Sequence, residues 1–367
     1  MGPRLVVSLV GAALLGLGGS AWAQSQWQGV TYPPAMSRAP ASHFLIIDTG
    51  GSGGGFGQGD VRQKLHDVSF WNARLGWTGG YGGLFRTEDG GLTWERMKPA
   101  GGWYHLAMTG PQEVWLLEGH HPGGPGKAFL WHTTDNGATW EEVQQGKLAG
   151  YADFYAQANL RWVLTGNYPS LRSDDGGATW REERFGGLLH GNSRIAIPGD
   201  VPTDGGFTVY VAGHYQHKFR LVKSTDGGEK WSLVPVPEGA IGECGALFFV
   251  TSRRGWVGGY GGEVACTDDG GETWESRNLP TDQRVMSLWF DQGGHGFAAV
   301  ANTDIFRFRD TLYETHDAGR TWTPVMGGAR FVKTIFALGP GQVWCVGDVP
   351  GFVQNDLVAI LTRETTE

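Results

Sequence analysis

The sequence predicts an all-β fold built from repeated four-stranded sheets, and two observations carry that prediction. One short pattern, Ser/Thr-x-Asp-x-Gly-x-Thr-Trp, occurs six times along the chain, with Lys230 replacing the Thr in the fourth copy. Successive copies lie roughly 40–50 residues apart, which is the length of one blade of a β-propeller. A closed ring of such blades is therefore the predicted architecture.

Each copy of the pattern lies between two extended segments and is predicted to form the turn of a β-hairpin. The Asp side chain accepts hydrogen bonds from backbone amides of its own turn, and the glycines permit a positive φ. The aspartates of the six copies are Asp89, Asp135, Asp175, Asp226, Asp269 and Asp317. The motif is therefore interpreted as structural.

A Trp ends every copy, and its ring is large enough to pack between neighbouring sheets, burying roughly 150–250 Å². These residues are Trp94, Trp140, Trp180, Trp231, Trp274 and Trp322. The chain of 367 residues contains 17 Trp and 62 Gly, a composition that suits tight turns around aromatic packing. Its net charge of -8, without any basic run, argues against nucleic acid or an anionic membrane as the main partner.

The N-terminus has the features of a secretory signal peptide. Arg4 precedes an apolar stretch, which ends at Ala21-Trp22-Ala23, a small-residue cleavage site. The stretch is shorter than the ~20 residues of a membrane-spanning helix. Residues 1–23 are therefore expected to be removed, and the mature protein is expected to begin at Gln24 and to be exported to a periplasm, lumen or medium.

Three cysteines remain in the exported chain, Cys244, Cys266 and Cys345, and all lie in apolar β-like runs. An odd count leaves at least one thiol unpaired. Buried free thiols are the expectation, and one disulfide is the alternative.

Seven blades are predicted, with six as the alternative. Residues 331–363 repeat the first three strands of a blade and then stop where the motif and the last strand should follow. The missing strand is expected from the N-terminal segment Gln26–Tyr32, because such a strand would close the ring and remove an open sheet edge. Residues 24–367 would thus form one domain, with residues 33–62 as a Gly-rich insertion loop.

Two blades carry the fullest repeat, Gly76-Trp77-Thr-Gly-Gly-Tyr81-Gly-Gly and Gly255-Trp256-Val-Gly-Gly-Tyr260-Gly-Gly, each leading into the motif. The motif is similar to the Asp-box, or BNR, repeat. The longer line resembles Ycf48/HCF136-like photosystem II assembly factors over nearly the whole mature chain, and sialidase-type propellers more distantly. That resemblance implies a β-propeller that acts as a non-catalytic assembly factor.

Ligand-binding residues are expected on the innermost strands, because these line the central channel of a propeller and loops on one face form its mouth. Polar side chains in or beside the predicted innermost strands are the binding candidates. They are His66, His105, His190, Arg194, Arg284, Arg330 and Lys333.

A carbohydrate-active hydrolase is the alternative function. The resemblance to sialidases implies a substrate carboxylate held by three arginines and a Tyr nucleophile, for which Arg194, Arg284, Arg330 and Tyr155 are the candidates. Guanidinium groups suit this role because they bind carboxylates bidentately. Asp153 and Glu243 are the candidate channel acids.

The sequence thus predicts an exported, monomeric, non-catalytic propeller that binds a protein or a glycan. No cofactor is expected. A metal site is not expected either, because His120-His121 and His214-x-x-His217 lack a third ligand at a motif spacing.

Overall fold

The computed structural model describes most of the chain from residue 65 onward and two short N-terminal strands. The described residues are 4–5, 43–48, 65–80, 83–91, 93–98, 102–119, 127–149, 151–157, 159–165, 170–199, 207–216, 218–237, 239–301, 310–327, 331–339, 341–349 and 355–362. No helix among them is long and apolar enough to cross a membrane.

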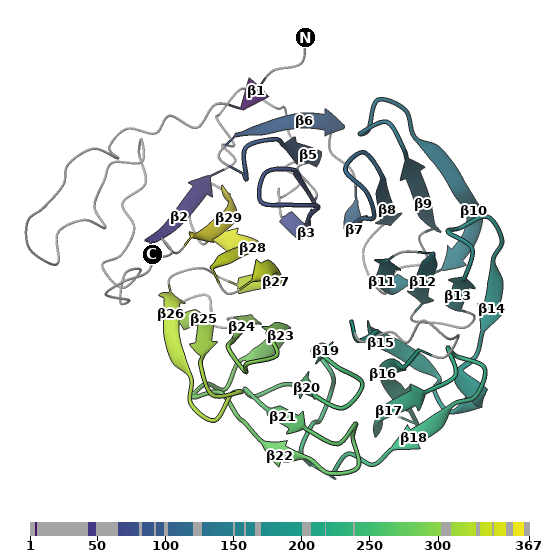
Figure 1. Cartoon of the computed structure of the whole chain (residues 1–367), viewed down its shortest axis with the longest axis vertical. Helices are drawn as coiled ribbons and strands as arrows, with labels where there is room; N and C mark the ends of the chain where they lie inside the picture. The colour runs from purple at the N-terminus through teal and green to yellow at the C-terminus, as the bar shows by residue number, and fades with distance from the viewer. Residues whose placement is uncertain are drawn as a thin grey trace, which may run out of the picture.

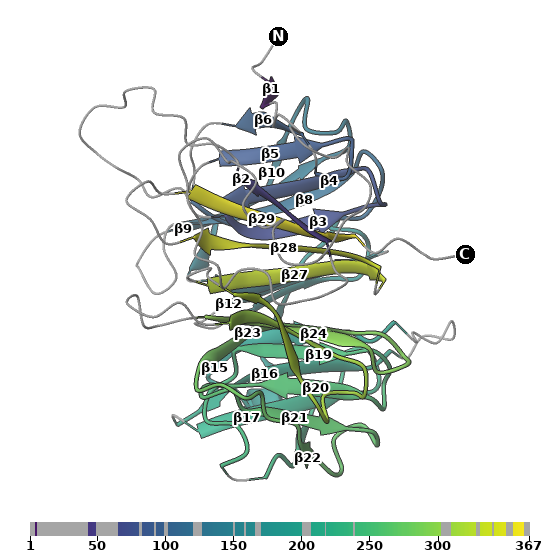
Figure 2. The same cartoon turned by 90° about the vertical axis from the view of Figure 1, so that its left-hand side faces the viewer.

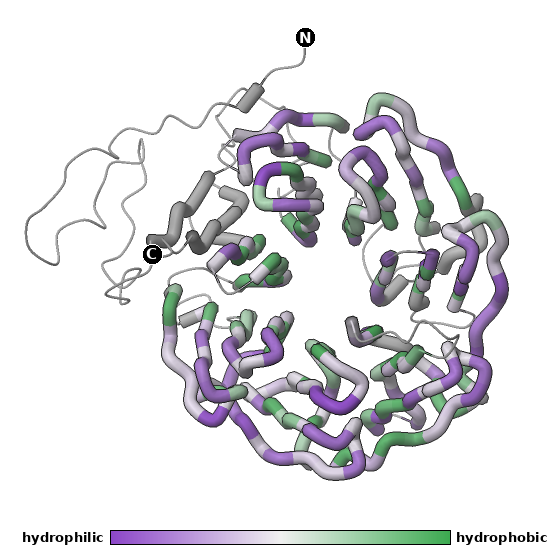
Figure 3. Tube along the Cα trace, viewed as in Figure 1, coloured by the Kyte–Doolittle hydropathy of each residue, from purple (hydrophilic) through white to green (hydrophobic). Residues whose placement is uncertain are grey.

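Antiparallel sheets follow one another around a closed ring (Figure 1). Figure 2 shows the same strands from the side, running from one face of the ring to the other. Hydrophobic and hydrophilic residues both occur in these sheets (Figure 3), and strands such as Val114–Gly119 and Gly255–Gly258 are buried along nearly their whole length, as expected for sheets that pack face to face. The all-β propeller prediction is confirmed.

Each of the first five sheets is an antiparallel meander whose strands follow chain order from the centre of the ring outward. Strand β1, at the outer edge of the first sheet, is the exception to this order. The first contains β3 (Leu65–Phe70), β4 (Gly76–Gly80), β5 (Gly83–Thr87), β6 (Trp94–Lys98) and, at the outer edge, β1 (Arg4–Leu5). The second contains β7 (Trp103–Met108), β8 (Val114–Gly119), β9 (Lys127–Thr133) and β10 (Glu141–Ala149). The third contains β11 (Tyr151–Gln157), β12 (Leu160–Thr165), β13 (Ser170–Ser173) and β14 (Arg181–Glu183).

A short 3-10 helix, Phe185–Gly187, leads into the fourth sheet. That sheet contains β15 (Gly191–Ala196), β16 (Val209–Tyr215), β17 (Lys218–Ser224) and β18 (Ser232–Val234). The fifth contains β19 (Ala246–Phe249), β20 (Gly255–Gly258), β21 (Val264–Thr267) and β22 (Glu275–Ser276).

The sixth sheet has eight strands and departs from the expected pattern. It contains β23 (Arg284–Phe290), β24 (Gly296–Ala301), β25 (Asp310–Thr315), β26 (Thr323–Gly327), β27 (Phe331–Gly339), β28 (Gln342–Val349), β29 (Asn355–Thr362) and β2 (His43–Asp48). The pair Ala301–Phe331 joins β24 to β27. Hydrogen bonding in the described chain therefore gives six sheets, not seven separate blades, because this pair merges two sets of strands.

An N-terminal strand does complete the last set, but it is not the expected one. Strand β2 pairs with β29 from His43–Thr362 to Asp48–Leu357. The expected segment Gln26–Tyr32 lies outside the described residues. Strand β2 lies within residues 33–62, which the sequence predicts to be an insertion loop, and its run Phe44-Leu-Ile-Ile47 has high strand propensity.

The repeated motif forms the same turn in each sheet that carries it. In the fifth sheet, the Thr267 hydroxyl donates to Asp269 Oδ1 at 2.8 Å and accepts from the Gly271 amide at 2.8 Å. The other Asp269 oxygen accepts from the Thr273 hydroxyl at 2.6 Å. These hydrogen bonds hold the pKa of Asp269 well below its ordinary value. Gly271 has φ 96°, which explains the glycine.

Aromatic rings pack between successive sheets, as expected for the motif Trp residues. The Trp140 ring meets the Trp77 ring of the preceding sheet edge-on at 5.9 Å, and Trp231 meets Trp162 at 6.2 Å. Trp77 and Trp162 are fully buried. The three cysteines are free and buried, which confirms the expectation made from their apolar surroundings.

Candidate functional site

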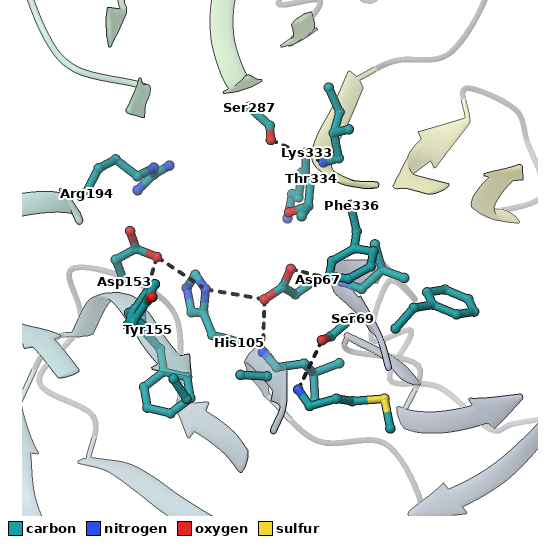
Figure 4. A pocket seen from close by; sticks show the side chains of 18 of the residues that line it. Asp67, Ser69, His105, Asp153, Tyr155, Arg194, Ser287, Lys333, Thr334 and Phe336 are labelled. Carbon is teal, nitrogen blue, oxygen red and sulfur yellow. Dashed lines mark hydrogen bonds and ion pairs between the residues drawn. The ribbon is translucent and has the colours of Figure 1, made fainter. Parts of the chain in front are cut away.

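A cavity of about 780 Å³ lies at the centre of the ring. Residues of all the innermost strands line it, namely β3, β7, β11, β15, β19, β23 and β27. It is the place where the ring structure brings together side chains that are far apart in sequence (Figure 4). We therefore treat it as the candidate functional site.

One position of the sheet register recurs in every innermost strand and always lines the cavity. In each innermost strand, one residue pairs with the aromatic residue of the next strand. The recurring position lies two residues before that paired residue. For example, Ser69 pairs with Trp77, and Asp67 lies two residues before Ser69. The residues at this position are Asp67, His105, Asp153, Arg194, Ala246, Ser287 and Thr334. We call these residues the inner ring.

β-Bulges explain how several of these residues are directed into the cavity. The pairing register shifts immediately before Asp67, Asp153, Arg194, Ser287 and Thr334. A bulge bends its strand and changes the direction of the side chain that follows, and bulges are common beside functional sites.

The two inner-ring carboxylates connect neighbouring innermost strands. Asp67 Oδ2 accepts a 2.9 Å hydrogen bond from the Leu106 amide of β7, and Asp153 Oδ2 accepts one of 3.0 Å from the Ile195 amide of β15. Each also accepts from the amide of the residue that follows it, Val68 or Phe154. Each carboxylate therefore accepts hydrogen bonds from two backbone amides, one of them in the neighbouring innermost strand, which is a structural role.

His105 lies between the two carboxylates, as the dashed lines in Figure 4 show. Its Nδ1 is 3.6 Å from Asp67 Oδ2 and 3.9 Å from Asp153 Oδ1. Burial lowers the pKa of His105 to about 4, and the positive charges of Arg194 and Lys333 act in the same direction. Burial raises the pKa of Asp67 to about 7, and the negative charge of Asp153 adds to this. The Asp67 carboxyl therefore titrates near neutrality while His105 stays neutral.

Tyr155 also lines the cavity, and its environment disfavours a nucleophilic role. Its hydroxyl donates a 2.5 Å hydrogen bond to Gln157 Oε1. Burial raises the pKa of the Tyr155 phenol, so the phenolate that would attack a sugar is harder to form than in water.

The structure brings together some of the predicted site residues and separates others. His105, Asp153, Arg194 and Lys333 line the cavity with Tyr155. Arg284 does not line it; Arg284 Nη1 instead donates to the Tyr260 hydroxyl at 2.8 Å, and Arg284 Nη2 is 3.9 Å from Glu243 Oε1.

The remaining predicted residues lie away from the cavity or outside the described chain. His66 is buried but does not line the cavity. His190 is exposed, with its ring 4.1 Å from that of Tyr215, and Glu243 is exposed as well. Arg330 lies outside the described residues.

Sequence reasoning missed Asp67, Ser287 and Thr334 as cavity residues. A signal for them exists in the repeat, because each lies the same number of residues before Trp77, Phe297 or Trp344, as His105 does before Trp115. Aligning the repeats on the aromatic residue would have selected Asp67 in place of His66.

No protein-family model matches the chain, and no curated protein sequence matches it. Among solved structures, one described as YCF48 bound to D1 peptide has a TM-score of 0.61 at 17% identity, covering 90% of this chain and 100% of that one. The extracellular domain of BT4673 from B. thetaiotaomicron has a TM-score of 0.61 at 14% identity, covering 84% and 39%.

A GH74 xyloglucanase from Xanthomonas campestris has a TM-score of 0.52 at 16% identity, covering 79% of this chain and 51% of that one. At these identities the similarities establish the β-propeller fold, which binding proteins and hydrolases share.

Proposed function

We propose that this protein is a non-catalytic scaffold that binds a segment of a protein partner in the central cavity, as an assembly factor does. The observation that carries the proposal is that both inner-ring carboxylates accept hydrogen bonds from backbone amides. Asp67 and Asp153 each bind two backbone amides and join neighbouring strands. Carboxylates so engaged support a rigid cavity better than they support proton transfer to a substrate.

The cavity itself suits a peptide rather than a small substrate. Acidic, basic, hydroxyl and apolar side chains line the cavity, and every innermost strand contributes to this lining. Different parts of an extended ligand therefore contact chemically different side chains. The similarity to YCF48, a structure of which is described as bound to a D1 peptide, supports the same class of ligand. A glycan remains the other class that such a cavity accommodates.

Selection from a random peptide library on the purified chain tests this proposal. Affinities of the selected peptides are then measured for the wild type, for Arg194→Ala in the cavity and for Arg253→Ala on an exposed loop. We expect Arg194→Ala to weaken binding at least about tenfold, or about 1.4 kcal/mol, and Arg253→Ala to leave it unchanged. Equal affinities for the two variants, or no selected peptide, would contradict the proposal.

A glycoside hydrolase is the second candidate, favoured by one observation. Asp67 has a pKa raised to about 7 and shares the cavity with Asp153, and glycosidases pair a carboxylic acid of raised pKa with a second carboxylate. A panel of aryl-glycosides that includes a sialoside tests it. Turnover by the wild type that Asp67→Asn and Asp153→Asn both abolish would establish a hydrolase.

We also propose that the eight-stranded sheet consists of two blades, β23–β26 and β27–β29 with β2, which gives seven blades in all. The single pair Ala301–Phe331 is the described hydrogen-bonded connection between the two sets.

Export after cleavage near Ala23, a single domain over residues 24–367 and a monomeric state belong to the same proposal. N-terminal sequencing of the exported protein and light scattering test them.

A further inference from the structure

Three side chains that the central cavity does not use converge beside the sixth sheet. His295 lies just before β24, Glu314 lies within β25, and His316 follows β25 in the turn motif. His295 Nε2 is 2.6 Å from Glu314 Oε1, and His316 Nε2 is 3.5 Å from the same oxygen. One ligand atom from each residue lies within 4.8 Å of the others.

The same sheet positions hold different chemistry elsewhere in the ring. The residue that faces the aromatic of the preceding strand is Arg86 in the first sheet and Arg172 in the third, and it is Glu314 in the sixth. The second residue of the motif is correspondingly acidic, so that Arg86 pairs with Glu88 at 3.3 Å and Arg172 with Asp174 at 2.8 Å.

In the sixth sheet the side chains at these two positions differ in kind. A carboxylate occupies the inner position and an imidazole, His316, occupies the motif position, with His295 as a second imidazole. The Glu314 side chain is only 7% exposed, so the carboxylate is held in a largely buried position beside the two imidazoles. Arg86 and Arg172 carry a positive charge at the inner position of the first and third sheets, where the sixth sheet has this carboxylate.

We propose that His295 Nε2, Glu314 Oε1 and His316 Nε2 bind a divalent transition-metal ion of the zinc class. Two imidazoles with one carboxylate form a set of zinc ligands, and the charge of the ion complements that of the Glu314 carboxylate. The two nitrogen ligands disfavour calcium and magnesium, which take oxygen ligands.

The backbone around the three ligands is already ordered. Glu314 pairs with Phe297 on one side and Thr323 on the other. The His295 amide donates to Asp291 Oδ1 at 2.9 Å, and the Asp291 amide donates to the His295 carbonyl at 2.9 Å. Ordered ligand backbones reduce the entropy lost on binding.

The outermost ligand provides access for the ion. The His316 side chain is 64% exposed, so its ring can rotate toward the ion without disturbing a strand. A coordination position that the three side chains leave free would be filled by water or by a group from a partner molecule.

Calorimetric titration of zinc chloride alone into the untagged, chelator-treated full chain tests the proposal. We expect one ion per chain, and at least about a tenfold loss of affinity in His316→Ala and in Glu314→Gln. His190→Ala, which removes an exposed imidazole away from the cluster, is the matched control and should bind zinc as the wild type does.

Thermal unfolding of the same proteins provides a second measurement, because a ligand that binds only the folded state raises Tm. Zinc should raise Tm in the wild type and in His190→Ala, but not in His316→Ala. The exposure of His316 keeps this test informative even where Glu314→Gln fails to fold. No zinc binding by the wild type, or equal binding by His316→Ala, would overturn the proposal.

Discussion

The turn motifs and the inner ring are both repeated around the molecule, but they repeat in different ways. The turns keep nearly the same side chains and contacts, so that the hydrogen bond of 2.8 Å that the Gly271 amide donates to the Thr267 hydroxyl recurs at 2.9 Å from the Gly319 amide to Thr315. The inner ring keeps the same register position while its side chains change from carboxylate to imidazole, guanidinium, methyl and hydroxyl. Constant chemistry thus marks what holds the ring together, and varied chemistry marks where a ligand is recognised.

The sixth-sheet cluster follows the same logic at a different position. Arg–acid pairs occupy that position in the first and third sheets, and a His–Glu–His cluster replaces them in the sixth. Where one sheet replaces a side-chain pair that other sheets share, and the backbone is unchanged, the replacement therefore indicates a different role for that position.

The largest expected loss of folding stability comes from removing a ring of the aromatic packing that supports both the turn motifs and the inner ring. Trp256 is fully buried, its ring is stacked 3.7 Å from that of Phe290, and its Nε1 donates to the Ala318 carbonyl at 3.1 Å. We expect Trp256→Ala to lower the free energy of unfolding by about 3–5 kcal/mol, measured by urea denaturation. Trp71→Ala, at a site that is 43% exposed, is the control, and an equal loss there would contradict the prediction.

A smaller loss of folding stability is expected from a substitution in the turn motif. Thr267→Val preserves the side-chain shape but removes the hydroxyl that accepts from the Gly271 amide, which leaves a buried donor unpaired. We expect a loss of about 1–3 kcal/mol in the free energy of unfolding. Thr225→Val, at the exposed variable position of the fourth motif, should stay within about 0.5 kcal/mol of the wild type. Similar losses in both variants would mean that the hydroxyl contacts do not stabilise the turn.

In the inner ring, the expected effect is a change in pH dependence. The folded pKa of Asp67, about 7, exceeds its ordinary 3.8, so its contribution to stability is full below pH 3.8 and is lost as pH rises toward 7. The folded pKa of His105, about 4, lies below its ordinary 6.5, so its contribution is full above pH 6.5 and is lost as pH falls toward 4. The two trends oppose each other between pH 4 and 6.5.

Removing either group should therefore expose the trend of the other. Relative to the wild type, Asp67→Asn should gain stability with rising pH over this window, and His105→Gln should lose it, each by at most ~1.4 kcal/mol per pH unit. Denaturation midpoints at half-unit pH intervals measure both slopes. Slopes of the same sign in the two variants would show that the pair does not titrate as described.

The smallest expected effect on stability comes from Arg194→Ala. Arg194 lines the cavity and is only partly buried, so its loss should change the free energy of unfolding by less than about 1 kcal/mol. Thermal unfolding checks this value beside the peptide-binding measurement. A loss as large as that of Trp256→Ala would place Arg194 among the structural residues and remove the contrast between the two regions.

Much of the fold could be predicted because it is local and repeated. The Asp, Gly and Trp of each motif act within one turn or against the adjacent sheet, so their roles follow from the pattern. The closing strand could be predicted in kind but not in position. Its pairing with β29 joins residues from the two ends of the chain, and several apolar N-terminal segments suit such pairing.

The candidate site was predicted less well, and His66 and Asp67 show why. Both are polar and adjacent in β3, yet a bulge between Leu65 and Asp67 directs Asp67 to the cavity while His66 is buried elsewhere. Because alternation along a strand assigns faces only when the register is regular, a one-residue bulge reverses the assignment.

The sequence by itself determined the all-β propeller, the turn motif with its aromatic packing and the buried state of the cysteines, because each depends on contacts between neighbouring repeats. Only the tertiary structure decided which polar residues meet at the centre, the merging of the last eight strands into one sheet and the convergence of His295, Glu314 and His316. These features depend on bulges, ring closure and strand-to-turn register, which bring distant or differently oriented residues together, so that alternation along a single strand does not reveal them.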